Sequence, residues 1–155
     1  KSIGVGVSDL ADLPIQDVSC GLPYLMVPLR DQSAVDRAAP DAKMPKIIQS
    51  VAGRDLPAFV FSIVADGVVY SRMFAPDIGI IEDPATGSAS GPLGCYLVRH
   101  GLVSPARASS IVSDQGVAMG RASRIHIAIT GSADAITDVR VGGEAVLVGR
   151  GELLV

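Results

Sequence analysis

Runs of apolar residues separated by short polar breaks indicate a chain built mainly from strands. The clearest case is residues 58–74, AFVFSIVADGVVYSRMF, where two runs rich in β-branched and aromatic side chains flank Asp66 and Gly67. An Asp-Gly pair between two such runs is typical of the tight turn of a β-hairpin. We therefore expect two antiparallel strands, one on each side of this turn.

Shorter apolar runs predict further strands. Residues 22–29, LPYLMVPL, form an apolar run between prolines, which is typical of a buried strand. In the last third of the chain, strand-like segments alternate with turn residues. The strands expected there are residues 110–113, 123–130, 136–141, 145–148 and 152–155, with Gly142 and Gly143 in the turn before the fourth.

Two short segments before the hairpin have helical patterning. Residues 33–40, SAVDRAAP, predict a short helix in which Ser33 is the N-cap and Pro40 ends the helix. Residues 42–52 predict a second helical piece.

A longer helix is predicted from about Pro92 to His100. Arg99 and His100 suit the negative end of a helix, and Gly101 fits the left-handed position just beyond it. The apolar residues of this segment cover much of the helix circumference, which favours an enclosed helix. They are Leu93, Cys95, Tyr96, Leu97 and Val98.

One enclosed helix among about seven or eight strands predicts an α+β fold, in which a curved, mostly antiparallel sheet wraps round a central helix. The chain has 155 residues, of which 48% are apolar and 19% are charged. This length and composition predict a single globular domain over residues 1–155 and leave no room for a second complete domain.

Charge and hydropathy argue against two classes of partner. The 13 Lys and Arg and the 16 Asp and Glu are interspersed and give a net charge of −3, so nucleic acid is not an expected partner. No run of about 18 apolar residues occurs, and no basic and apolar leader opens the chain. We therefore expect no membrane span and no signal peptide, and we expect the cytoplasm as the compartment.

The cysteines and histidines do not form a metal-binding pattern. Cys20 and Cys95 lie far apart without a CxxC motif, and the only histidines are His100 and His126. The sequence therefore predicts free, buried thiols and no metal or redox site. His126 suits the face of a strand, and Arg121 suits a turn at the surface.

The stretch EDPATGSASG, residues 82–91, is the strongest candidate for chemistry. It precedes the predicted helix, and the start of a helix has unpaired N–H groups that stabilise an anion. The lysine and spacing of a phosphate-binding P-loop are absent, which favours a carboxylate or a small neutral oxygen over a nucleotide as ligand. The small residues and the hydroxyl donors of this cradle are Gly87, Ala89 and Gly91, and Thr86, Ser88 and Ser90.

Asp83 is the candidate acid or base beside this cradle. Pro84 holds it in an extended conformation, within reach of a ligand bound at the helix start. Abstraction of a proton next to a carboxylate needs such a pairing of donors and base. In the alternative, the loop is only a structural turn and helix cap, and the spacing of its residues alone favours this interpretation. Glu82 is then expected to be a solvated neighbour.

Residues 72–101, RMFAPDIGIIEDPATGSASGPLGCYLVRHG, resemble the signature of the phenazine-biosynthesis isomerase-like family, whose members share the diaminopimelate-epimerase fold. Residues 18–31, 115–127 and 141–153 resemble further family segments in the same order. The resemblance implies two similar halves, each a sheet curled round a central helix, with the active site between them. This chain resembles the second, C-terminal half.

The resemblance also implies roles for individual residues. The family's aspartate in the DPATGS motif falls on Asp83, and its substrate-contacting serine falls on Ser88. Gly87 and Ala89 would supply backbone N–H groups, and Gly21 would face the cleft. The family's best-known activity is a cofactor-free isomerisation of a dihydro-hydroxyanthranilate, so no cofactor and no metal are expected.

The family's principal acid/base is a glutamate in the first half, assisted by a histidine there, and this chain has no match for either. The related two-thiol epimerases carry a cysteine in the loop, whereas residues 82–94 contain none. Cys20 stands where the family commonly has threonine. The resemblance therefore implies an N-terminal domain as partner, and a homodimer.

Two functions follow as hypotheses. In the first, the chain is the C-terminal domain of a cofactor-independent isomerase or epimerase that transfers a proton on a small carboxylated metabolite. On its own such a domain lacks the principal glutamate, so we expect weak or no activity. In the alternative, the chain is a non-catalytic module that binds small molecules or interacts with proteins and has kept the fold.

Overall fold

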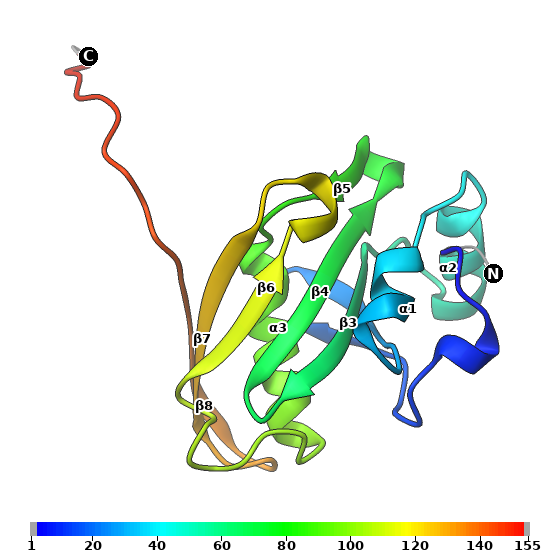
Figure 1. Ribbon diagram of the computed structural model, residues 1–155, viewed down its shortest axis with the longest axis horizontal. Coiled ribbons are helices and arrows are strands. Elements are labelled where there is room, and N and C mark those ends of the chain that lie inside the picture. The colour runs from blue at the N-terminus through cyan, green and yellow to red at the C-terminus, as the bar shows by residue number, and fades with distance from the viewer. Residues whose placement is uncertain (1–2, 154–155) are drawn as a thin grey trace.

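The computed structural model describes residues 3–153, and within them an eight-stranded sheet curls round one long helix (Figure 1). The strand order is β1-β2-β3-β4-β6-β7-β8, and β5 pairs with β4 outside this path. The strands are β1 (Gln16–Ser19), β2 (Pro23–Pro28), β3 (Ala58–Ala65), β4 (Val68–Ala75), β5 (Ile80–Asp83), β6 (Ile111–Gln115), β7 (Ser123–Gly131) and β8 (Ile136–Gly142).

The helices lie on opposite faces of this sheet. The long helix α3 packs against β1, β2, β7 and β8 on the concave face, whereas α1 packs against β3 and β4 on the other face (Figure 1). The helices are α1 (Gln32–Arg37), α2 (Met44–Ala52) and α3 (Gly87–Arg99), and the short 3-10 turns are η1 (Val7–Asp9), η2 (Pro76–Ile78) and η3 (Val117–Met119).

The predicted fold class is confirmed. The pairs β2–β3 and β4–β6 are parallel, and the other neighbouring pairs are antiparallel. The predicted hairpin is β3–β4, with Asp66 and Gly67 in its turn. Successive strand residues point to opposite faces of a sheet, so a strand covered on both faces is apolar throughout. That explains the unbroken apolar run at the start of β3.

The core is divided into two clusters by the sheet. On the concave face, Phe59 and Phe61 pack with the α3 side chains Leu93 and Tyr96. On the other face, Val60 packs with residues of α1 and α2 such as Val35 and Met44. Helix α1 covers only the first part of β3, because Val64, on the same face as Val60, is 56% exposed. The second face is therefore only partly covered.

Helix α3 begins earlier than the sequence predicts. It starts at Gly87, so Pro92 lies inside the helix instead of at its first turn. The proline-based boundary was wrong because the small residues before Pro92 continue the helix toward the N-terminus. At the other end, Gly101 has φ +64°, and the N–H of Leu102 donates to the Leu97 carbonyl over 2.9 Å. The predicted C-terminal end is therefore confirmed.

The predicted N-cap of α1 was wrong. Asp31 is the N-cap: its Oδ1 accepts hydrogen bonds from the Ala34 N–H at 2.8 Å and from the Ser33 hydroxyl at 2.7 Å. Ser33 therefore lies within the helix, which ends at Arg37. The carboxylate is the stronger acceptor and takes the capping position.

The last predicted strands are not strands in the structure. Residues 143–153 have no assigned secondary structure and lead away from the sheet (Figure 1). Among the described residues no strand pairs with this segment, so the prediction for residues 145–148 and for 152–153 was wrong, and residues 154–155 lie outside the described part. Two observed strands, β1 and β5, were not predicted; each has four residues, and neither contains a long apolar run.

Candidate functional site

The candidate loop joins β5 to the N-terminus of α3 and ends in the first turn of the helix. Asp83 is the last residue of β5, and its main chain pairs with Met73 of β4. Asp83 Oδ2 accepts a hydrogen bond from the Thr86 hydroxyl at 2.6 Å. The carboxylate is therefore held beside the start of the helix.

A buried glutamine fixes the loop from below. Gln115, at the end of β6, is fully buried, and its Nε2 donates to the Asp83 carbonyl at 2.7 Å and to Thr86 Oγ1 at 2.9 Å. Its Oε1 accepts the N–H of Thr86 at 3.1 Å. Because buried polar groups are costly unless paired, these three bonds tie the loop to the sheet. Sequence reasoning missed Gln115, although its place after the inward-facing Ile111 and Ser113 was a usable signal.

The turn after β6 also contacts the loop closely. Gly116 has φ +76°, and a Cβ at this position would lie 2.6 Å from the Pro84 carbonyl oxygen and 2.4 Å from that of Arg121. A side chain has no room here, and the backbone conformation favours glycine. Gly116 therefore allows the β6–β7 connection to pack directly on the main chain of the DPATG segment.

Glu82 is not a solvated neighbour, and that prediction was wrong. Its carboxylate forms a two-pronged ion pair with Arg72 at 2.8 and 2.7 Å, and the two side chains are only 12% and 10% exposed. The hydrogen bonds to Glu82 raise the pKa of Arg72 above its usual value. Arg72 Nη1 also donates to the carbonyl oxygens of Val35, Asp36 and Ala38.

Neighbouring acids on β5 thus have different environments. Consecutive strand residues point to opposite faces, so Glu82 reaches Arg72 on the face that carries α1, and Asp83 turns toward the start of α3. In the described residues no salt bridge involves Asp83. Glu82 anchors the loop through its ion pair, whereas the Asp83 carboxylate accepts a hydrogen bond from the Thr86 hydroxyl.

Ser88 is exposed in the first turn of α3, and its Oγ lies 2.7 Å from the hydroxyl of Tyr24. Tyr24 is itself only 3% exposed and comes from β2, so sequence reasoning did not connect the two residues. Within residues 3–153, the N–H groups of Gly87 and Ser88 have no hydrogen-bond partner. These groups can receive an anionic oxygen.

Other members of the predicted cradle are already engaged. The Ala89 N–H donates to the Thr86 carbonyl at 3.2 Å, and the buried Ser90 hydroxyl donates to the same oxygen at 2.8 Å. The Thr86 hydroxyl donates to Asp83. The prediction that Thr86 and Ser90 act as donors to a ligand was therefore wrong, because their hydroxyls bond within the loop.

Gly21 lies in the exposed turn between β1 and β2. A Cβ there would meet nothing within 4 Å. This turn runs along α3, since a Cβ at Gly91 would lie 3.6 Å from the Cys20 sulfur. Both thiols are free, but Cys20 is exposed and Cys95 only partly buried, so the prediction of two buried thiols was wrong.

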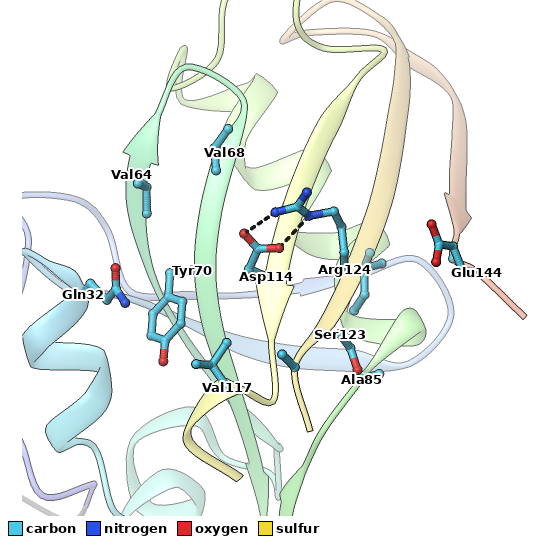
Figure 2. Close-up of a pocket in the computed structure, with 13 residues that line it drawn as sticks. Gln32, Val64, Val68, Tyr70, Ala85, Asp114, Val117, Ser123, Arg124 and Glu144 are labelled. Carbon is cyan, nitrogen blue, oxygen red and sulfur yellow. Dashed lines mark hydrogen bonds and ion pairs between the residues drawn. The ribbon is translucent and has the colours of Figure 1, made fainter. Parts of the chain in front are cut away.

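A large hollow lies elsewhere in the described structure. It has a volume of about 860 Å³ and opens on the sheet face opposite α3, between α1 and the end of β8 (Figure 2). Asp114 and Arg124 form an ion pair across its floor, at 2.9 Å. Of the motif only Ala85 reaches its wall. The hollow therefore does not contain Asp83, Ser88 or Gly21.

Residues 2–151 match the sequence profile of the family described as phenazine biosynthesis-like protein. The chain belongs to this family. A family relative, an uncharacterised isomerase of Clostridium acetobutylicum, is 32% identical over 163 residues, which cover 99% of this chain and 52% of the relative. A trans-2,3-dihydro-3-hydroxyanthranilate isomerase of Pseudomonas chlororaphis is 45% identical over 84 residues, 54% of this chain and 30% of that protein.

A solved structure supports the same assignment. The structure of a predicted epimerase from Pseudomonas aeruginosa matches with a TM-score of 0.73 and 36% identity, over 99% of this chain and 50% of that one. The phenazine biosynthesis-like family is thus one of isomerase-type enzymes. The chain spans about half the length of the relatives that it matches over most of its residues. Among its described residues, no helix is long and apolar enough to cross a membrane.

Proposed function

We propose that this chain is the C-terminal domain of a cofactor-independent isomerase or epimerase, which transfers a proton on a small carboxylated metabolite. One observation carries the proposal: the Asp83 carboxylate lies at the same helix start as the N–H groups of Gly87 and Ser88, which have no hydrogen-bond partner in the described residues. Membership of a family of isomerase-type enzymes supports it.

Each site residue has a distinct role in this proposal. Asp83 assists proton transfer or orients the general acid/base, and its position depends on Thr86 and Gln115. Ser88 contacts the substrate carboxylate with its hydroxyl, which Tyr24 orients. The N–H groups at the helix start stabilise the negative charge of that carboxylate and of an enolate that forms during proton abstraction.

Backbone hydrogen bonds refine the carboxylate site. The free N–H groups belong to Gly87 and Ser88, while the Ala89 N–H bonds to Thr86. Ala89 then acts as a small, buried residue beneath the site, and Gly21 leaves open space along the same helix. A carboxylate can accept hydrogen bonds from these two N–H groups. The name of the Pseudomonas chlororaphis isomerase likewise describes a carboxylated compound.

The proposal assigns the other half of the site to a further domain. That domain supplies the principal glutamate, and the complete enzyme is a homodimer. The chain spans about half of the matched relatives, which leaves room for such a domain. General acid/base catalysis typically supplies about 10²–10⁴-fold in rate, so the 155-residue chain alone should be weakly active or inactive.

The test uses this chain together with the proposed N-terminal domain. It measures how fast a carbon-acid substrate takes up deuterium from the solvent. The first compound to try is trans-2,3-dihydro-3-hydroxyanthranilate, after which the Pseudomonas chlororaphis relative is named. Asp83→Asn and Ser88→Ala should each slow uptake, Asp83→Asn by about 10²–10⁴-fold. The exposed Asp55→Asn and Ser109→Ala are matched controls and should leave it unchanged. Uptake that survives both site substitutions contradicts the assigned roles.

A further inference from the structure

The two cysteines meet in space although they lie 75 residues apart in the chain. Cys20 Sγ and Cys95 Sγ are 3.6 Å apart, and both thiols are free. Cys20 follows the end of β1, and Cys95 lies in the middle of α3. Two thiols in contact need only a small movement to reach bonding distance.

The members of this pair differ in access and in chemistry. Cys20 is exposed, so a dissolved oxidant reaches it, whereas Cys95 is partly covered by the concave core. Burial, together with the hydrogen bond to Cys20, raises the pKa of Cys95 to about 12. Cys95 is therefore a protonated thiol at neutral pH.

The contact distance also excludes one catalytic role. In a two-base epimerase the acid and the base flank a substrate carbon from opposite sides. Sulfur atoms at 3.6 Å already touch and leave no space for a carbon between them. The pair is suited to reaction between its own members.

We propose that Cys20 and Cys95 form a redox modification site, in which a peroxide or a small disulfide such as oxidised glutathione converts the two thiols into an intramolecular disulfide. With hydrogen peroxide, the Cys20 sulfur attacks one oxygen, breaks the O–O bond and becomes a sulfenic acid, and the other oxygen leaves as water. Cys95 then forms the S–S bond and displaces the hydroxyl, which takes the thiol proton and leaves as a second water. Two electrons pass from the thiols to the peroxide.

With oxidised glutathione the balance is equivalent. Cys20 forms a mixed disulfide and releases one glutathione thiol. Cys95 then attacks the Cys20 sulfur and releases the second. The protein loses two hydrogen atoms in either route. Such a reaction suits a site with one exposed thiol and a second thiol at contact distance.

The disulfide would act on the edge of the sheet next to the candidate site. Strand β1 pairs only with β2 among the described strands, so it is an edge strand. The β1–β2 hairpin also carries Tyr24, whose hydroxyl forms a hydrogen bond with Ser88. Ser88 lies about two helical turns before Cys95 along α3. A Cys20–Cys95 bond would fix this hairpin to the helix and slow its local opening.

The test uses the 155-residue chain and does not depend on the proposed isomerase activity. Reduced protein is exposed to hydrogen peroxide or oxidised glutathione, and remaining thiols are alkylated before mass analysis. We expect loss of two hydrogens, no alkylation, and a peptide that links Cys20 to Cys95. Hydrogen exchange of the β1 amides should slow by about tenfold, with β7 amides unchanged.

Single variants separate the roles of the two thiols. In Cys95→Ser, Cys20 should accumulate as a glutathione adduct, because no second thiol displaces the glutathione. In Cys20→Ser, Cys95 should remain reduced under the same conditions. A stable glutathione adduct in the wild-type chain, independent alkylation of both thiols, disulfides only between two chains, or unchanged β1 exchange after oxidation would each overturn the proposal.

Discussion

The start of α3 and the hollow on the opposite face of the sheet differ in how they combine space and chemistry. The hollow has about 860 Å³, within the range of small-molecule sites, but its polar centre is the ion pair of Asp114 and Arg124. The helix start offers unpartnered N–H groups and a carboxylate held by a buried network. The comparison shows that the large volume and the unpartnered N–H groups lie in different places. If another domain supplies the second wall of a site, this chain alone would show unpartnered polar groups and no enclosed cavity, as its described residues do at the start of α3.

The ion pairs of the two regions provide the largest expected contrast. Glu82→Gln removes one partner of the buried pair beneath the loop and leaves the charge of Arg72 uncompensated, at a cost of about 3–5 kcal/mol. Asp114→Asn removes the acid from the exposed pair in the hollow and should cost about 0–1 kcal/mol. Urea unfolding of both variants measures the difference. Equal losses would contradict the anchoring role of Glu82.

The buried amide of Gln115 gives the next effect. Gln115→Leu leaves the Thr86 N–H and the Asp83 carbonyl without their partner, which should cost about 1–3 kcal/mol in stability. Gln49→Leu on the exposed side of α2 is the control and should change stability by less than about 0.5 kcal/mol. Hydrogen exchange at Thr86 should rise in the first variant only. Unchanged exchange at Thr86 would show that Gln115 does not hold the loop.

Two glycines of one turn test the contact between η3 and the loop. Gly116→Ala combines a positive φ with a Cβ 2.6 Å from the Pro84 carbonyl, whereas Gly120→Ala has a positive φ but no neighbour within 4 Å. We expect Gly120→Ala to cost about 1 kcal/mol and Gly116→Ala to cost about 1–2 kcal/mol more. Thermal unfolding compares them. The same loss for both would mean that the approach to Pro84 does not constrain the loop.

The cap of α1 gives the smallest effect and acts on the side of the hollow. Bonds from Ser33 and Ala34 lower the pKa of Asp31 to about 2. Because the folded-state pKa is below the unfolded one, this contribution is present above about pH 4 and is lost as the pH falls toward 2. Asp31→Asn should therefore lower the melting temperature at pH 6. The difference in melting temperature between this variant and the wild type should become smaller as the pH falls toward 2. A constant difference over this range would contradict the assignment.

Local patterns predicted the elements that local physics determines. The β3–β4 hairpin follows from Asp66 and Gly67, and the end of α3 follows from Gly101, because turn chemistry is encoded by adjacent residues. The family resemblance pointed to Asp83 and Ser88, which the structure places at one helix start.

The parts that sequence reasoning missed depend on contacts between distant segments. Gln115 and Thr86 are 29 residues apart, and Tyr24 and Ser88 are 64 apart, so no local period reveals them. The pairing of Glu82 with Arg72 depends on which face of β5 each acid occupies. Strand β1 has four residues and no apolar run, so only its pairing with β2 defines it.

The most direct test of the central claim is an NMR titration of the ¹⁵N-labelled chain with benzoate, using benzamide as the neutral control of the same shape. If the start of α3 is a carboxylate site, benzoate should shift the amide signals of Gly87 and Ser88, and benzamide should not. Ser88→Ala should weaken the response. Shifts centred on Asp114 and Arg124 in the hollow, or equal shifts with both compounds, would contradict the account.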